Sequence, residues 1–317
     1  MSRSLLLLLV ALPGLAAADG GVAPDGAVPG GDGGHALPPR AAPRPADEAL
    51  LARLCGQPPR SLEPLRKGTT LKLKIVVTDG AIGVLRPAQR NEAGYFRADV
   101  AAYLLAQRLG LDQVPPACLR TVAREQLLAA AGELRPRFER EVTWSKDGRG
   151  AEAAVVAWVD HVASSHLAES RREWQPLLAQ GRPLVGAPSL LRAAAQASEL
   201  LTWDFLIANW DRWSGSNTFA VGKSGPAVWL DNAAGFGRYS PPMRRRNEGH
   251  LAGLERFSRR FVTALRAVGD EELERALRPA GLPLMAVRQL TARRATLLHH
   301  IDGLIARFGD AAVLCFD

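Results

Sequence analysis

The chain has 317 residues, of which 47% are hydrophobic, and its formal net charge is +8 at pH 7. This length and apolar content supply the core of one domain or of two closely packed lobes, and they exclude a chain that is disordered throughout. The charge comes from 35 Arg and 5 Lys spread along the chain. Because aromatic residues do not interleave with them, the pattern is not typical of a single-strand binder, and no nucleic-acid partner is predicted.

The N-terminal residues differ in composition from the rest. Residues 1–18 combine Arg3 with a short leucine-rich run and a small-residue end, which is the pattern of a cleaved export signal peptide. An uncleaved anchor is the alternative, although the run is too short to span a membrane. Residues 19–47 are rich in Gly, Pro and Ala and predict a disordered linker. We therefore expect a folded domain over 48–317, with no stable membrane span once the signal is removed.

Three cysteines, Cys55, Cys118 and Cys315, are consistent with an exported protein that carries one disulfide and one spare thiol. Their spacing does not say which two pair. The chain has no CxxC motif and no Cys/His cluster, so a structural zinc site is not predicted.

The first half of the domain predicts a small lobe rich in strands. Alternating apolar residues followed by Asp-Gly at 79–80 indicate two strands joined by a tight hairpin. A helix with Val100, Leu104 and Leu111 on its apolar face is expected to stop at Gly110. In chain order, we expect a helix over 46–55, strands over 70–77 and 81–87, a helix over 97–111, and strands over 114–122 and 153–159.

The second half is predicted to be mostly helical, with one hairpin. Its GKS sequence is not a phosphate-binding loop, because the first Gly of that motif would fall at Asn217. Neither a G-x-S-x-G nor an H-E-x-x-H motif is present, so hydrolase and metalloprotease functions lose support. We expect helices over 189–208, 254–268, 270–281 and 285–308, and a hairpin formed by 217–221 and 226–231.

This order of elements predicts the α+β fold class, as a bilobal protein-kinase-like fold. The small strand-rich N-lobe is expected over about 48–160 and the mostly helical C-lobe over about 161–317. The polar segment between the long helix and the hairpin lies where such a fold carries its chemistry.

Phosphoryl transfer needs a group that accepts the proton of the attacking hydroxyl and oxygen ligands for a divalent metal. Asp211 is the candidate base, and Asn217 and Asp231 are the candidate metal ligands. The hairpin between Asn217 and Asp231 returns the chain to the same place, so both Asp side chains can face one cleft. The structural alternative is that Asp211 caps a turn and Asp231 only ends a strand.

Two stretches, LLTWDFLIANWDRWSGSNTF (200–219) and VWLDNAAGFG (228–237), resemble the catalytic segment of the secretory-pathway kinases. That family includes the Golgi casein kinase, the proteoglycan xylose kinase and, most similar to this chain, four-jointed. Residues 68–89 are similar to the family's first strands, and residues 98–116 to its helix and the Val-Pro-Pro that follows. With gaps, the resemblance covers about residues 68–307.

The resemblance implies a role for each of these polar residues. Asp211 matches the catalytic aspartate, Asp231 the metal aspartate and Asn217 a loop Asn of four-jointed, although Gly215 lengthens this loop by one residue. By the same resemblance, the residues expected to support the catalytic loop are Asp204, Asn209 and Arg212.

Two further positions depart from the family pattern. Arg86 stands where Golgi casein kinase has the nucleotide lysine, and Asp99 stands where the paired helix Glu is expected. The longer reach of Arg86 is expected to close the ion pair with the shorter Asp99. Lys72 matches a family lysine and is predicted to contact the nucleotide. Lys72 and Lys74 share one face of their strand, and that face is alternatively the solvated side of a half-buried strand.

The prediction is therefore an exported enzyme, a kinase that transfers the γ-phosphoryl group of ATP to a hydroxyl of an exported protein (Ser/Thr) or of a glycan. Its cofactors would be ATP and Mn²⁺ or Mg²⁺. One alternative is a pseudokinase that acts as a binding or allosteric module. The other is a basic secreted protein that binds polyanions through the arginines at 244–246. The expected location is the periplasm or cell exterior in a bacterium, and the Golgi lumen or beyond in a eukaryote.

Overall fold

The computed structural model describes residues 45–66, 68–90, 95–165, 167–214, 217–222, 225–237 and 241–316. The predicted export signal, most of the predicted linker and Gly215 lie outside these residues. Helix α1 (Pro45–Gly56) begins before the predicted end of the linker at residue 47. Asp47 and Glu48 lie in its first turn, where acidic side chains stabilise a helix, and Tyr103 donates a hydrogen bond to Asp47 Oδ2.

A five-stranded antiparallel sheet in the order β1-β2-β3-β5-β4 forms the N-lobe. The predicted hairpin is confirmed, since β2 pairs with β3 on either side of Asp79-Gly80. Strand β1 was not predicted, because its sequence PRSLEP begins and ends with proline, a residue that sheets tolerate mainly at an edge. The strands are β1 (Pro59–Pro64), β2 (Leu73–Val77), β3 (Ile82–Pro87), β4 (Ala117–Ala123) and β5 (Gly150–Ala157).

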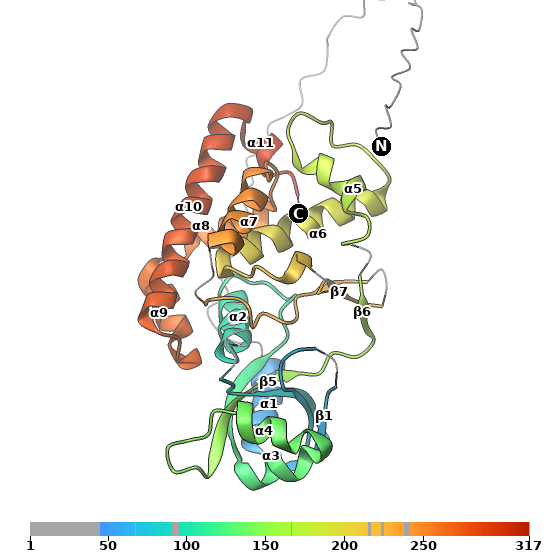
Figure 1. Ribbon diagram of the computed structural model, residues 1–317. Coiled ribbons are helices and arrows are strands. Elements are labelled where there is room, and N and C mark those ends of the chain that lie inside the picture. Colours follow the sequence, from blue (N-terminus) through green and yellow to red (C-terminus); the bar gives the residue numbers. More distant parts are fainter. Residues whose placement is uncertain are drawn as a thin grey trace, which may run out of the picture. The chain divides into compact units, whose positions relative to one another are not determined.

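One face of this sheet packs against helices and forms the core of the lobe. Leu73, Ile75 and Val77 of β2 are fully buried and alternate with residues on the opposite face. This core contains residues of α1, α3 (Arg124–Ala130) and α4 (Arg135–Glu141). Figure 1 shows these helices together with the sheet.

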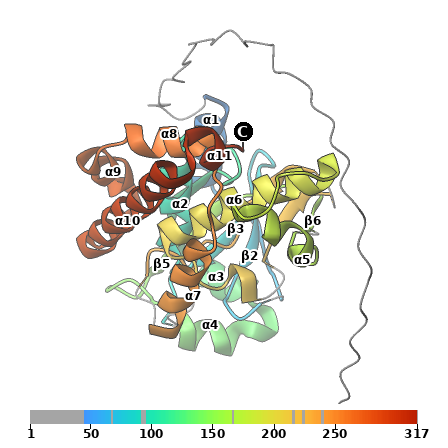
Figure 2. The same ribbon diagram turned by 90° about the horizontal axis from the view of Figure 1, so that it is seen from above.

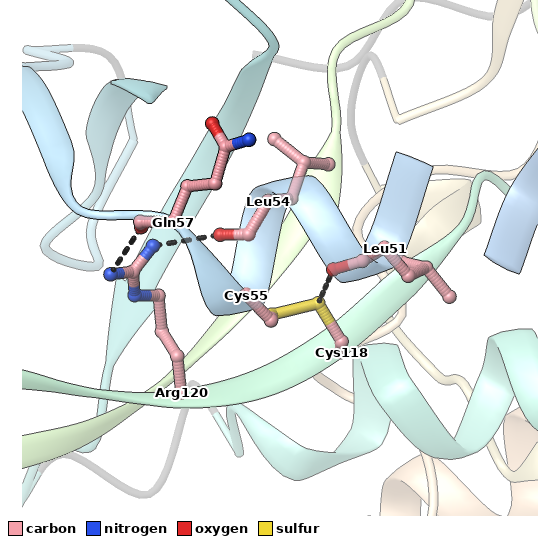
Figure 3. Close-up of a disulfide and its surroundings, with 6 residues drawn as sticks. All are labelled: Leu51, Leu54, Cys55, Gln57, Cys118 and Arg120. Atoms are coloured by element: carbon pink, nitrogen blue, oxygen red, sulfur yellow. Dashed lines mark hydrogen bonds between the residues drawn. A yellow bond between two sulfur atoms is a disulfide. The ribbon is translucent and has the colours of Figure 1, made fainter. Parts of the chain in front are cut away.

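A disulfide joins α1 to β4 through Cys55 and Cys118, whose Cα atoms lie 6.4 Å apart. Cys315 lies outside this bond. Arg120 of β4 donates to the carbonyl oxygens of Leu54 and Gln57 at the end of α1 (Figure 3). The disulfide and these bonds hold the helix on the sheet.

Helix α2 (Arg97–Arg108) lies between the sheet and the C-terminal helices (Figure 1). Of its predicted apolar residues, Val100 is buried and Leu104 is partly buried, while Leu111 is buried just beyond the helix end. Arg97 Nη1 donates to the carbonyl oxygen of Ala280 at 3.0 Å. Asp99, on this helix, is therefore carried by an element in contact with both lobes.

The C-lobe is built around α6 (Pro188–Ile207), which contacts α5, α7 and α10 (Figure 2). Helix α7 was not predicted, because its sequence PPMRRRNEGHLA lacks a regular apolar stripe. The other helices are α5 (Arg171–Trp174), α7 (Pro241–Ala252), α8 (Arg259–Ala267), α9 (Asp270–Leu277), α10 (Leu284–Phe308) and α11 (Asp310–Val313), with short 3-10 turns η1 (Gly132–Leu134), η2 (Gln175–Leu178), η3 (Arg212–Ser214) and η4 (Arg278–Ala280).

The predicted hairpin of the second half is confirmed as β7 (Phe219–Val221) paired with β8 (Ala227–Val228). A third strand, β6 (Val162–Ser164), was not predicted and pairs with β7. Since β6 closely follows β5, this small sheet links the chain leaving the N-lobe to the hairpin that follows Asp211. None of the helices among the described residues combines the length and apolar character that crossing a membrane requires.

Candidate active site

A cavity of about 620 Å³ opens between one face of the five-stranded sheet and the β6–β8 sheet. Most of its wall is apolar, and its charged residues include four of those predicted to form the site. The apolar wall includes Val84, Val156, Val159, Val162, Phe219 and Leu230, and the four predicted charged residues are Lys72, Arg86, Asp99 and Asp231.

The register of the sheet explains why Lys72 and Arg86 point into this cavity. Lys74 pairs with Val84 and Leu73 with Leu85, so Lys72, Val84 and Arg86 lie on the same face. That face is opposite the one that carries the buried leucines of the N-lobe core. The alternating sequence of β2 therefore delivers one lysine to the cavity, as predicted.

Arg86 and Asp99 form the predicted ion pair. Arg86 Nε lies 3.4 Å from Asp99 Oδ2, and the two side chains are only 6% and 4% exposed. The backbone N–H of Asn232 donates to the other carboxylate oxygen of Asp99 at 3.1 Å. Burial raises the pKa of Asp99, and the charge of Arg86 partly opposes that rise.

Asp231 lies three residues after the end of β8 and is bound by two cations. Arg86 Nη2 donates to its Oδ1 at 2.9 Å, and Lys72 Nζ donates to its Oδ2 at 3.4 Å. Burial acts to raise the pKa of Asp231, but Arg86 and Lys72 hold it well below its usual range. The backbone φ of Asp231 is 54°, in the left-handed region that is rare outside glycine. The fold thus holds an ionised carboxylate in an unusual conformation at the charged end of the cavity.

Asp211 follows a sharp end of helix α6. Ala208 caps the helix with φ 60°, a position that usually carries glycine, and the chain then leaves the helix axis. Asp211 is half-buried, and its pKa is raised by burial and then by the charge of Asp231. The two carboxylates therefore lie close enough to repel each other.

The loop around Asp211 is supported by a buried ion pair. Arg212 Nε donates to both carboxylate oxygens of Asp204, at 2.7 and 3.0 Å, and Trp213 donates to the same carboxylate at 3.1 Å. Burial raises the pKa of Asp204 to about 6, although Arg212 acts to lower it. Arg212 also donates to the carbonyl oxygen of Leu230, beside Asp231, at 2.7 Å. Arg212 therefore joins the loop that carries Asp211 to the segment that follows β8.

Asn232 was missed as a site residue. Its side-chain oxygen accepts from Arg212 Nη2 at 2.9 Å and from Trp203 at 3.3 Å, while its backbone binds Asp99. It thus connects α2, α6 and the loop that carries Asp211, next to Asp231. Its sequence signal is its place in the LDN motif, directly after Asp231.

Asn217 and Asn209 each contact the rest of the site through a backbone carbonyl oxygen. The carbonyl oxygen of Asn217 accepts from Arg212 Nη1 at 3.4 Å, and its role as a metal ligand stays a prediction. Asn209 is fully buried, and its carbonyl oxygen accepts from Asn247 at 3.3 Å. Asn209 supports the loop through its backbone.

The residues present fit a divalent cation that is coordinated partly by protein carboxylates and partly by the phosphates of a bound nucleotide. Among the residues that the structure describes, no three His, Cys, Asp or Glu side chains gather as a ready-made metal cluster. Mg²⁺ and similar ions at nucleotide sites take one or two carboxylates and complete their shell with phosphates and water. The repulsion between Asp211 and Asp231 is a feature that such a cation would relieve.

His250 lies against this site and gives a prediction about pH. Its ring contacts Trp213, and its pKa is lowered to about 4 by burial and by the nearby Arg171 and Arg246. A histidine with a depressed folded pKa contributes stability above its unfolded pKa of about 6.5 and loses it as the pH falls through about 4.

We expect acidification from pH 7 to pH 4 to remove about 2 kcal/mol of unfolding free energy from wild type through His250, after allowance for its partial exposure. His250→Gln should lack this part of the acid-side loss. Denaturant titrations of both proteins across this range measure the difference. Identical pH profiles of the two proteins would contradict the assignment.

Comparisons with known proteins agree with this geometry. Residues 69–224 match the family model of the four-jointed box protein middle domain. The chain is similar to the Golgi casein kinase solved with Mn and ADP bound, with a TM-score of 0.63 and 16% identity over 84% of this chain and 78% of that one. It is also similar to hydra Fam20 solved with sugar, with a TM-score of 0.64 and 16% identity over 87% of this chain and 95% of that one. The search of curated proteins gave no match. The predicted bilobal protein-kinase-like fold is confirmed.

Proposed function

Because residues 69–224 match the family model of the four-jointed box protein middle domain and the chain has the fold of the Golgi casein kinase and Fam20, we propose that the protein is an exported, metal-dependent kinase. It transfers the γ-phosphoryl group of ATP to a hydroxyl of an exported protein or glycan. The observation that carries this proposal is the cluster of Lys72, Arg86, Asp99 and Asp231 in a cavity whose wall is mostly apolar. A nucleotide has the same division, with a flat apolar base and a charged triphosphate.

We infer the orientation of the nucleotide from the residues that line the cavity. Val84, Val156 and Leu230 line the part suited to the purine ring. Arg86 and Lys72 supply the cations for phosphate oxygens, and Arg86 offers a planar fork of donors. Asp99 keeps Arg86 in place and partly neutralises it.

In the proposed reaction, the acceptor hydroxyl oxygen forms a bond to the γ-phosphorus while the bond from that phosphorus to the bridging oxygen of ADP breaks. Asp211 accepts the proton of the hydroxyl, and its pKa, raised by burial and by Asp231, makes it a stronger base than an ordinary aspartate. Arg212 and Asp204 hold the loop that carries Asp211. ADP leaves with the electron pair of the broken bond.

Mn²⁺ or Mg²⁺ is the proposed metal, since the similar Golgi casein kinase was solved with Mn and ADP. Asp231 would hold it, with Asn217 as a second ligand. When bound, the cation offsets the negative charge that builds up on the transferring phosphoryl group.

The proposed compartment is oxidising. The Cys55–Cys118 disulfide is typical of proteins that work outside the cytosol. This supports a location in the periplasm or cell exterior in a bacterium, and in the Golgi lumen or beyond in a eukaryote. Both protein and glycan hydroxyls suit the same Asp211, so both belong in an acceptor panel.

A pseudokinase is the second candidate, because both oxygens of Asp231 are already engaged by Arg86 and Lys72. A protein that keeps these pairs when nucleotide binds would hold the ligand without transferring phosphate.

Metal removal tests the proposed enzyme. We expect ATP turnover with Mn²⁺ to fall at least 100-fold when the metal is chelated and to return when Mn²⁺ is added in excess, because the triphosphate charge is otherwise left uncompensated. The measurement is ADP release by the full chain at fixed ATP. Turnover that is unchanged by chelation would contradict the metal assignment, and nucleotide binding without any turnover would select the pseudokinase.

A further inference from the structure

Both carboxylate oxygens of Asp231 are bound by cationic side chains of the protein. Each of its carboxylate oxygens has one cationic partner, Arg86 at 2.9 Å and Lys72 at 3.4 Å. These contacts join residues 145 and 159 positions apart in the chain. The residue proposed to bind the metal is therefore neutralised by the two residues proposed to bind phosphate.

Arg86 in turn needs Asp231 to compensate its buried charge. Arg86 is 6% exposed, and its Nε and Nη1 have no hydrogen-bond partner among the described residues. Its only acidic contacts among these residues are Asp231 and Asp99, the latter at 3.4 Å. Drawing Asp231 away would leave Arg86 and Lys72 to share Asp99, and a buried cation without a full partner is costly.

A divalent cation that binds without nucleotide therefore competes with Arg86 and Lys72 for Asp231. To bind Asp231 it must displace two cations and leave them near its own positive charge. A triphosphate alone meets the opposite problem, since it attracts Lys72 and Arg86 but leaves Asp211 and Asp231 facing its negative charge. When both ligands enter together, phosphate oxygens take over the cations and the metal takes over the carboxylate.

We propose that Lys72 couples metal binding to nucleotide binding, by occupying Asp231 until a triphosphate draws it away. This inference rests on the proposed function and adds a role for one residue that the function does not require. Lys72 is the more movable partner, because its flexible side chain is 18% exposed whereas Arg86 is 6% exposed and also held by Asp99. Coupling between two ligands is reciprocal, so each ligand tightens the other by the same factor.

The chain supplies a matched control in Lys74. It lies two residues from Lys72 on the same sheet face, but its Nζ is placed over the ring of Trp158, 5.4 Å from the ring centroid. It makes no hydrogen bond or ion pair to Asp231 among the described contacts. Lys74→Met removes the same charge from the same strand without touching the metal carboxylate.

The experiment measures Mn²⁺ affinity and nucleotide affinity separately in the full chain. Free Mn²⁺ is counted by electron paramagnetic resonance in the absence of nucleotide. Binding of a non-hydrolysable ATP analogue is followed by tryptophan fluorescence, with and without saturating Mn²⁺. In wild type, we expect Mn²⁺ to tighten the analogue at least tenfold.

Lys72→Met should bind Mn²⁺ alone about three- to tenfold more tightly than wild type, and Mn²⁺ should tighten the analogue by a correspondingly smaller factor. Lys74→Met should behave as wild type, because the charge that it removes does not contact Asp231. A Lys72→Met protein that binds Mn²⁺ no more tightly than wild type would overturn the coupling role and leave the kinase proposal standing. If wild type binds no analogue under any condition, the kinase proposal and the coupling role both fail.

Discussion

Arg212→Met is expected to lower the unfolding free energy by about 3–5 kcal/mol, because it leaves the carboxylate of Asp204 buried without its cation. Asp204 is 2% exposed and Arg212 is 1% exposed, so water cannot replace the lost partner. Methionine keeps most of the volume but none of the donors. The carbonyl oxygen of Leu230 and the side-chain oxygen of Asn232 would each lose a hydrogen bond as well.

An exposed arginine, Arg244, is the control that separates the loss of the buried ion pair from the loss of a positive charge in general. Arg244 pairs with Glu248 at 2.7 Å on the exposed surface of α7, where the two side chains are 68% and 49% exposed. Arg244→Met should cost less than about 1 kcal/mol, as exposed pairs do. Denaturant unfolding of both variants gives the comparison. Equal, small losses in the two variants would show that the buried pair does not organise the catalytic loop.

Asp211→Asn is expected to lower kcat by about 10²–10⁴-fold while leaving the protein as stable as wild type or slightly more stable. Asparagine keeps the size of the side chain but cannot accept the hydroxyl proton. Burial and Asp231 raise the pKa of Asp211, which means that its ionised form is disfavoured in the folded state. Removing that charge is therefore expected to leave the free energy of unfolding unchanged or to raise it.

Loss of activity with retained stability distinguishes a reacting group from a structural one. Steady-state phosphoryl transfer and thermal unfolding, measured on the same preparation, provide both values. A fall in thermal stability as large as that expected for Arg212→Met would indicate that Asp211 only caps the turn. Unchanged kcat would remove Asp211 from the reaction.

The local parts of the site were predictable because their signals lie within short stretches of sequence. The IANWDRW segment and the LDN motif place Asp211 before, and Asp231 after, one hairpin. The alternating strand before Asp79 places Lys72 on one face, and the structure shows that this is the cavity face. The pairing of Arg86 with Asp99 followed from the family resemblance, in which the nucleotide cation pairs with a helix Glu, and the two side chains do meet.

The other parts depend on contacts between distant segments. The bond from Asn232 to Asp99 joins residues 133 positions apart, and the contact of Lys72 with Asp231 joins residues 159 positions apart. Spacing along the chain does not predict contacts between such distant residues. For the same reason, it did not predict that Cys55 pairs with Cys118. Strand β6 was missed because three residues are too few for a periodic signal, and its pairing with β7 depends on the tertiary fold.

We propose that this site moves a phosphoryl group to a hydroxyl, and γ-labelled ATP makes that transfer visible as label on the acceptor. The wild-type chain is incubated with Mn²⁺ and a panel of peptide and glycan acceptors, beside Asp211→Asn. We expect label to appear covalently on at least one acceptor class in wild type and to fall at least 100-fold in the variant. Equal labelling by the two proteins, or labelled phosphate released only to water while nucleotide is bound, would contradict the claim.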